Sequence, residues 1–346
     1  MNRFILGITA IVIIRSSTWL ASLRPNLLSL CIKTISFCLL ISFPYTTKTF
    51  CAPASKYELG LRTDNDSYLL HGQDRYYSNG IFLNFRYLLP GKAKSVHSAK
   101  ILKRIAEVKI GHEIYTPYSG YAPYPEMIDR PFAAYLFMNM KGHFFLKNEQ
   151  VISVGMELGI LGSAAKGKEL QTAVHSMLGL YKPAGWETQI RNAPGINFDI
   201  SYLKTIYCSH NNLFDAHLIT SAHLGTIYID GSAGIILRAG RFRKMGASAL
   251  TGSLLGTGEK IREFYAFLNP SVNVIGYNAT IQGGMFNKDK GPIVFSPVPI
   301  TFSSQIGAAY VNHHITIDVS VIIKTKEVKT ITTNQYGSIS IKYRFK

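Results

Sequence analysis

The stretch from Asp64 to Gly80 gathers many of the side chains that could bind a metal ion or take part in catalysis. Its sequence, DNDSYLLHGQDRYYSNG, connects two segments that alternate like β-strands. Asn65, Asp66 and Ser78 offer oxygen ligands, which suit a hard cation such as Ca²⁺ better than a transition metal, although such ligands also accept Mg²⁺. The alternative is a simple turn, because Asn and Asp side chains readily bond their own backbone.

A second pair of candidate residues lies in the segment KELQTAVHSML, Lys168–Leu178, which is predicted to be a short helix that ends at Gly179. Gln171 and His175 are four residues apart and therefore project from the same helix face. His175 could activate water as a general base, with Gln171 orienting the base or the substrate, or it could be an ordinary helix residue. A bound cation would polarise an ester carbonyl. The sequence has no G-x-S-x-G elbow, so direct attack by water is favoured over an acyl-serine intermediate.

Residues 1–54 have the composition of an export segment. They contain five basic residues but no Asp or Glu, and two apolar stretches, Ile5–Ile14 and Leu27–Phe43, precede Ala52-Pro53-Ala54. This A-x-A site predicts a secretory signal that is cleaved after Ala54. The alternative is a retained membrane anchor, but Lys33 interrupts the longer apolar stretch. The predicted division is therefore an export segment over 1–54 and a folded domain over 55–346.

The charge and the cysteine content of the predicted mature chain limit its partners. The 346 residues include 37 Lys and Arg against 20 Asp and Glu, and loss of the first 54 residues leaves a net charge of +12. Such a basic exported protein is suited to anionic lipid, since no segment resembles a nucleic-acid-binding module. Only Cys208 remains after residue 54, which excludes an intramolecular disulfide and a cysteine metal site.

Alternation of apolar and polar residues recurs along the whole of the predicted domain. For example, Tyr57, Leu59 and Leu61 alternate with Glu58, Gly60 and Arg62. A soluble sandwich would alternate in the same way. Segments of about ten residues, aromatic residues near their ends and a last segment with Phe345 as its penultimate residue favour a transmembrane β-barrel. The predicted fold is therefore all-β, a closed antiparallel transmembrane barrel of about 12 strands.

The barrel topology places the candidate residues together. The strands are predicted near 56–64, 79–88, 105–115, 131–143, 150–161, 195–208, 213–226, 229–242, 263–276, 300–311, 312–325 and 335–345, with 277–299 as a long loop or an extra hairpin strand. Loops after odd-numbered strands are then extracellular, and the short helix lies in one of them. The groups Asn65, Asp66 and Ser78; Tyr115 and Asp129-Arg130; and Gln171 and His175 are thus expected on one extracellular rim.

The order of these motifs resembles the lipid A 3′-O-deacylases, a family of calcium-dependent outer-membrane barrels of Gram-negative bacteria. The matching segments are Asn65-Asp66, DRYYSNG (74–80), IYTP (114–117), DRPFAAYLF (129–137), LGILGSAAKGKELQTAVHSMLG (158–179) and GWETQI (185–190). They cover roughly the first half of the predicted mature chain. The second half is supported mainly by its strand pattern.

The resemblance implies an active site of Asn65, Asp66, Ser78, Gln171 and His175. In it, His175 activates water, and a Ca²⁺ ion near Asn65-Asp66 acts on the ester. The implied substrate is lipid A of the outer-membrane lipopolysaccharide, and a monomeric barrel is expected. The sequence departs from the family at Tyr181, where some members carry Glu. It also lacks the basic residues that can follow IYTP, which leaves Arg75 and Arg130 near the rim.

The sequence is also compatible with two other functions. The same ester chemistry could act on a phospholipid, releasing a fatty acid and a lysophospholipid. The barrel could also be noncatalytic, as a porin, an adhesin or a structural protein. A porin needs an open lumen, whereas small barrels are usually filled by side chains. The inward-facing Glu58, Arg62, Arg86, Glu157 and Asp199 are predicted to fill this lumen with ion pairs.

Overall fold

The computed structural model of the protein describes residues 54–69, 74–90, 95–96, 99–257 and 261–346. The predicted export segment lies outside the described residues, except for Ala54, and its cleavage stays a prediction. In the described part of the chain, no helix combines the length and the apolar character needed to cross a membrane.

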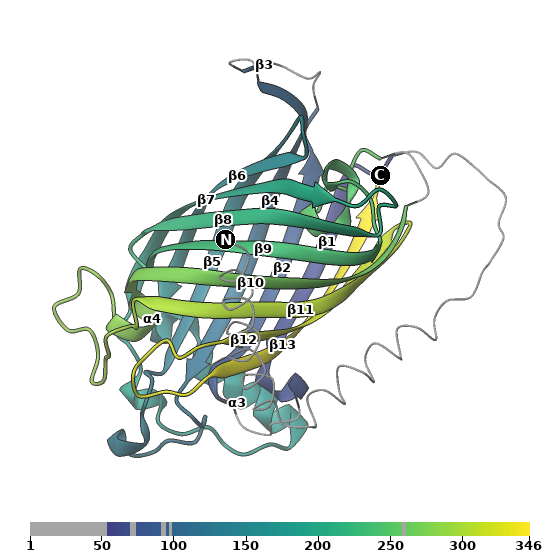
Figure 1. The fold of residues 1–346 in the computed structure, drawn as a ribbon. Coiled ribbons are helices and arrows are strands. Elements are labelled where there is room, and N and C mark those ends of the chain that lie inside the picture. The colour runs from purple at the N-terminus through teal and green to yellow at the C-terminus, as the bar shows by residue number, and fades with distance from the viewer. Residues whose placement is uncertain (1–53, 70–73, 91–94, 97–98, 258–260) are drawn as a thin grey trace, which may run out of the picture. The chain divides into compact units, whose positions relative to one another are not determined.

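Twelve antiparallel strands form a closed barrel (Figure 1). They are β1 (Tyr57–Asn65), β2 (Tyr76–Leu88), β4 (Ala99–Thr116), β5 (Ala133–Leu146), β6 (Gln150–Leu161), β7 (Ala193–Cys208), β8 (Phe214–Gly225), β9 (Tyr228–Arg241), β10 (Arg262–Asn278), β11 (Ile300–Asn312), β12 (Ile315–Lys324) and β13 (Asn334–Phe345). The two-residue β3 (Ser95–Val96) pairs only with β4 and lies outside the barrel wall. The predicted fold is confirmed.

The first and last strands close the barrel. β1 pairs with β13 over its whole length, from Tyr57 opposite Phe345 to Asn65 opposite Gly337, and with β2 on its other edge. Closure gives every strand a partner on both edges, which lipid cannot provide. The aromatic end of the chain takes part in this seam, since the rings of Tyr57 and Phe345 stack with centroids 5.6 Å apart.

The twelve predicted strands correspond one to one with the strands of the barrel. The largest difference in a boundary is in β4, which begins six residues before the predicted start at 105. The ambiguous segment 277–299 adds no strand to the barrel: it holds the one-turn helix α4 (Ala279–Gln282), and irregular chain follows it. Alternation predicted the strands because each has one face toward the lumen and one facing outward.

Two ends of the barrel differ in the length of their connections. The loop end carries 66–75, 117–132, 162–192, 279–299 and 325–333, and it corresponds to the end that the sequence predicts to be extracellular. It holds the helix α3 (Gly167–Leu178), α4 and the short 3-10 helices η1 (Asp66–Leu69), η2 (Pro125–Met127), η3 (Ser163–Ala165) and η4 (Trp186–Thr188). Figure 1 shows α3 and α4 at this end and β3 at the opposite one. The opposite end, called the turn end here, holds η5 (Met245–Ala247) and η6 (Ala249–Thr251).

Charged side chains fill the lumen, as the sequence predicts. Arg86 forms ion pairs with Glu107 and, at 3.1 Å, with Glu58. Glu58 also pairs with Arg344 at 3.3 Å. Two more of the predicted lumen acids have partners too: Asp199 pairs with Lys141, and Glu157 accepts hydrogen bonds from Tyr135 and Asn197. Pairing of this kind is what allows charges to be buried.

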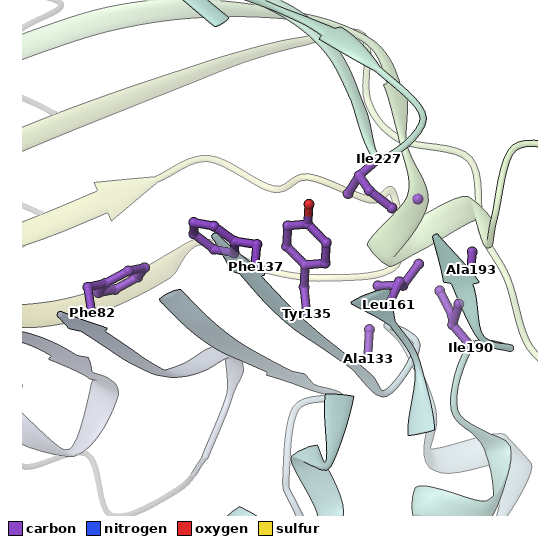
Figure 2. Packing of buried hydrophobic residues seen from close by; sticks show 9 residues of the cluster. Phe82, Ala133, Tyr135, Phe137, Leu161, Ile190, Ala193 and Ile227 are labelled. Atoms are coloured by element: carbon purple, nitrogen blue, oxygen red, sulfur yellow. The ribbon is translucent and has the colours of Figure 1, made fainter. Parts of the chain in front are cut away.

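Apolar side chains close the lumen beneath the loops. Figure 2 shows Phe82, Phe137 and Tyr135 in a row that ends among Leu161, Ile190, Ala193 and Ile227. These residues come from β2, β5, the end of β6, the start of β7 and two connections, in which Ile190 precedes β7 and Ile227 lies between β8 and β9. The cluster also includes Ala279 of α4. The loop end is therefore packed with side chains below the candidate site.

The connection between β9 and β10 closes the turn end. Met245 and Leu255 are buried against Ile105, Phe145 and Val151 of the barrel wall. Polar contacts hold the same segment in place: Lys103 Nζ donates to the Ser253 and Leu255 carbonyls, Arg238 donates to Ser248, and Glu263 accepts from two backbone amides of the connection. Residues 242–257 therefore close this end of the lumen, and this segment is called the plug.

The filled lumen predicts that the protein does not conduct ions as a porin does. We expect the refolded wild-type barrel in planar lipid bilayers to give no sustained channel steps, because side chains occupy the lumen at both ends and in the middle. A porin refolded and inserted by the same procedure serves as the positive control. Long-lived, ohmic steps from the wild-type protein would contradict this description of the lumen.

Candidate active site

The helix α3 presents one face to the barrel and brings the two predicted residues with it. Gly167, Gln171 and His175 are its buried residues, spaced at four-residue intervals. Gly167 permits the close approach, since a Cβ there would lie 2.4 Å from the Ala134 Cβ and 2.7 Å from the Trp186 ring. The helix therefore holds Gln171 and His175 against the rim on one face, and this is the shared face that the sequence predicts.

The end of α3 returns the chain over the imidazole of His175. Gly179 adopts a left-handed conformation (φ 68°), and the Leu180 N–H donates to the His175 carbonyl at 2.8 Å. Two residues after Gly179, the Tyr181 carbonyl oxygen lies 2.7 Å from His175 Nδ1. The rings of Tyr181 and His175 meet edge to face, with their centroids 4.7 Å apart. A carbonyl only accepts, so Nδ1 carries a hydrogen and donates it.

Asp74 is the centre of the hydrogen-bond network at this site. Its Oδ2 lies 2.7 Å from His175 Nε2 and accepts from Gln171 Nε2 at 2.9 Å and from the Tyr181 hydroxyl at 2.7 Å. Asp74 belongs to the loop after β1, whereas its three partners belong to the loop after β6. One carboxylate oxygen thus joins two loops that are almost a hundred residues apart in the sequence.

The neighbours of Gln171 fix its orientation. The buried Trp186 indole N–H donates to Gln171 Oε1 at 2.7 Å, so the amide nitrogen must face Asp74. The third loop covers the network, since a Cβ on Gly120 would lie 2.5 Å from the Tyr181 hydroxyl and 2.9 Å from Gln171 Nε2. Asp74 is therefore surrounded by side chains of the loop after β6 and by the backbone of the third loop at Gly120.

Asn65 and Asp66 lie where β1 ends. Asn65 Oδ1 accepts from the Ser67 N–H at 2.7 Å, which is the bond of an Asx turn. The buried Asp66 accepts the Arg75 N–H on Oδ2 at 2.5 Å, next to Asp74. Burial, with the charge of Asp74 as a smaller cause, raises the pKa of Asp66 to about 8. The sequence allowed two interpretations of Asn65, as a residue that forms a turn or as a residue of the site. The two are compatible, because the turn places Asn65 next to Asp66.

Ser78 occupies a bulge in β2. Tyr77 is opposite Tyr115 and Asn79 is opposite Ile114, so Ser78 is the extra residue between them. Its buried hydroxyl donates to the Ile114 carbonyl at 3.4 Å. Bulges re-aim side chains and are common next to active sites. Asp64, by contrast, binds Tyr77 and Ser338 of the barrel and so has a structural role.

The oxygen atoms near Asp66 fit a hard cation. Asp66 Oδ1 and Asn79 Oδ1 are buried and have no hydrogen-bond partner among the described residues. An unpaired buried carboxylate oxygen is costly unless an ion or a water compensates it. No three His, Cys, Asp or Glu side chains in the described ranges are grouped for metal binding, so a cation would also need amide, hydroxyl, backbone or water oxygens. Asp66, Asn65 and Ser78 are the predicted side chains that could contribute.

Asp74 is the residue that sequence reasoning did not select for the site. It stands in the conspicuous loop, but only the packing of α3 shows that it meets Gln171 and His175. Arg130, by contrast, was predicted to lie on the rim, and the structure places it in the interior. It is fully buried, donates to Thr280 at 3.0 Å and lies over the Tyr115 ring, so it is not available on the rim to bind a phosphate group.

The comparisons with known proteins agree with this fold. The family model described as "Outer membrane protein LpxR" matches residues 34–345. The solved structure of LpxR from Salmonella typhimurium is similar to this chain, with a TM-score of 0.67 and 20% identity over 83% of this chain and 100% of that one. The β domain of the Bordetella autotransporter BrkA aligns over 84% of this chain and 100% of its own, with a TM-score of 0.44 and 10% identity.

A search of the curated proteins found no match. The family model nevertheless covers nearly the whole of the described barrel, and the structural likeness extends over the full length of the Salmonella protein. The protein is therefore located in the bacterial outer membrane, and the longer connections at its loop end are of the kind that outer-membrane barrels have on their extracellular side. The chain belongs to the outer membrane protein LpxR family.

Proposed function

We propose that the protein is a lipid A 3′-O-deacylase of the outer membrane, which hydrolyses the 3′ acyl ester of lipid A with a water molecule that His175 activates. The observation that carries this proposal is the convergence of Gln171, His175 and Asp74 at the extracellular rim of a barrel of this family. An imidazole whose Nδ1–H is held by a backbone carbonyl and whose Nε2 faces a carboxylate is suited to general base catalysis.

Each residue of the site has a role that its contacts support. His175 accepts the proton of the attacking water, and the Gln171 amide holds Asp74, which in turn contacts the base. Asn65 forms the turn that positions Asp66. The bulge in β2 sets the direction of the Ser78 side chain. When bound, Ca²⁺ would polarise the ester carbonyl. Asp66, with Asn65 and Ser78, is proposed to hold that ion.

The surface beside His175 is apolar and exposed. Met177, Leu178 and Leu180 are 78%, 61% and 53% exposed at the end of α3. Apolar residues exposed together next to an active site mark a place for an apolar ligand. In an outer-membrane barrel, such residues at the rim are suited to contact acyl chains, which supports a lipid substrate over a soluble ester.

Phospholipid remains the second candidate substrate. It would offer the same ester bonds and acyl chains to the site. The sequence placed two cations on the rim, Arg75 and Arg130, but Arg130 is buried. Arg75, which lies over the Tyr118 ring, is therefore the one of the two that could contact a lipid phosphate. Lipid A is preferred because the motifs of the site are those of the family.

The first prediction of this proposal concerns His175. In cells that expose lipid A to the protein, wild-type expression should remove the 3′ acyl chains, and His175→Ala should lower the rate by roughly 10²–10⁴-fold through loss of the base. Mass spectrometry of extracted lipid A measures the change. His210→Ala, at an exposed position in the turn after β7, is the matched control and should behave as the wild type. Unaltered lipid A with a folded, inserted wild-type barrel would contradict the proposal.

The second prediction concerns the metal ion. Removing one charge with Asp66→Asn should weaken Ca²⁺ binding by at least about tenfold, or ~1.4 kcal/mol. The readout is thermal unfolding of the purified barrel at increasing Ca²⁺, because an ion at 100 times its Kd stabilises the folded state by about 2.7 kcal/mol. Glu126→Gln, an exposed acid of the same rim, is the control. A Ca²⁺-dependent stabilisation that Asp66→Asn leaves unchanged would place the ion elsewhere.

A further inference from the structure

Asp74 and His175 approach in a way that requires a shared proton. The Nδ1–H of His175 is committed to the Tyr181 carbonyl, so Nε2 is the nitrogen left for acid–base chemistry. Nε2 lies 2.7 Å from Asp74 Oδ2. A carboxylate oxygen and an imidazole lone pair would repel each other at this distance, and one proton between them turns the contact into a charge-assisted hydrogen bond.

The surroundings of Asp74 keep its carboxylate in place for this contact. Gln171 and Tyr181 both donate to the same Oδ2, and the buried Trp186 holds Gln171. The described residues place no hydrogen-bond partner on Asp74 Oδ1, and the side chain keeps 15% of its surface exposed. A water molecule can therefore approach the pair.

We propose that Asp74 and His175 act as one acid–base pair, in which a proton bridges Asp74 Oδ2 and His175 Nε2 and the proton that leaves the attacking water enters the pair at Asp74 Oδ1. This inference rests on the proposed hydrolase function. The water O–H bond breaks, its proton enters the pair, and the hydroxide oxygen bonds to the ester carbonyl carbon. The acyl C–O bond then breaks, and the pair returns the proton to the departing alkoxide. The products are a fatty acid and an alcohol.

The proposal predicts a specific pattern in the kinetics of three variants. Asp74→Asn should lower kcat by on the order of 10²-fold with little change in KM, because the amide cannot share the proton. Tyr181→Phe removes one donor and leaves the pair intact, so its effect should be smaller. Tyr181 lies against both members of the pair, and Asp74→Asn with Tyr181→Glu should therefore restore a carboxylate and regain at least about tenfold in kcat.

The assay uses the full-length, refolded barrel with purified lipid A in mixed micelles and Ca²⁺. Asp289→Asn, an exposed rim acid paired with Arg191, is the control, and the gel shift of the folded barrel on heating verifies folding of each variant. Loss of kcat in Asp74→Asn with rescue in the double variant supports the pair. Wild-type kcat in folded Asp74→Asn, or a loss that Tyr181→Glu does not reverse, overturns it.

The same experiment separates this inference from the function on which it rests. A wild-type barrel whose ester hydrolysis depends on His175 but survives Asp74→Asn overturns the pair and leaves the hydrolase proposal standing. A folded wild-type barrel that cleaves no lipid ester overturns the hydrolase proposal, and the inference falls with it.

Discussion

The backbone hydrogen bonds that close the sheet are the constraint on which the rest of the protein depends. Lipid offers no partner to a free strand edge, so β1 must pair with β13 as well as with β2. Once the seam is made, every outward side chain faces lipid and every inward one enters the lumen. The lumen then needs paired charges such as Glu58 with Arg86 and Arg344. Most of the long loops are collected at one end, and the candidate site is built from three of them.

The strands could be predicted because a two-residue period is a local property of the sequence. The helix α3 could be predicted for the same reason, and the spacing of Gln171 and His175 gave their shared face. The contacts of Asp74 and Arg130 depend on tertiary packing, which no period encodes. The plug of residues 242–257 has no repeat either, since η5 and η6 are single turns held by contacts with distant strands. Local patterns therefore predicted the scaffold and part of the site, but not the network that joins its loops.

Tyr181 connects the two groups of the proposed acid–base pair. The resemblance to the lipid A deacylases implied that some members have Glu at this position, where this chain has Tyr181. Here the tyrosine uses both of its polar groups: its carbonyl accepts from the His175 Nδ1–H, and its hydroxyl donates to Asp74. The carboxylate beside the imidazole belongs to Asp74, in the loop after β1. The acid next to His175 is thus supplied by a loop that is distant from it in the sequence.

Hydrolysis of lipid A by the isolated protein tests the central claim most directly. The refolded wild-type barrel would be incubated with purified lipid A and with phospholipid in separate micelles, with Ca²⁺ or a chelator, and the products located by tandem mass spectrometry. We predict lipid A that lacks the acyl groups at the 3′ position, free fatty acid in equal amount, and loss of both in chelator. Intact lipid A alongside lysophospholipid would contradict the substrate, and intact lipids of both kinds would contradict the enzymatic function.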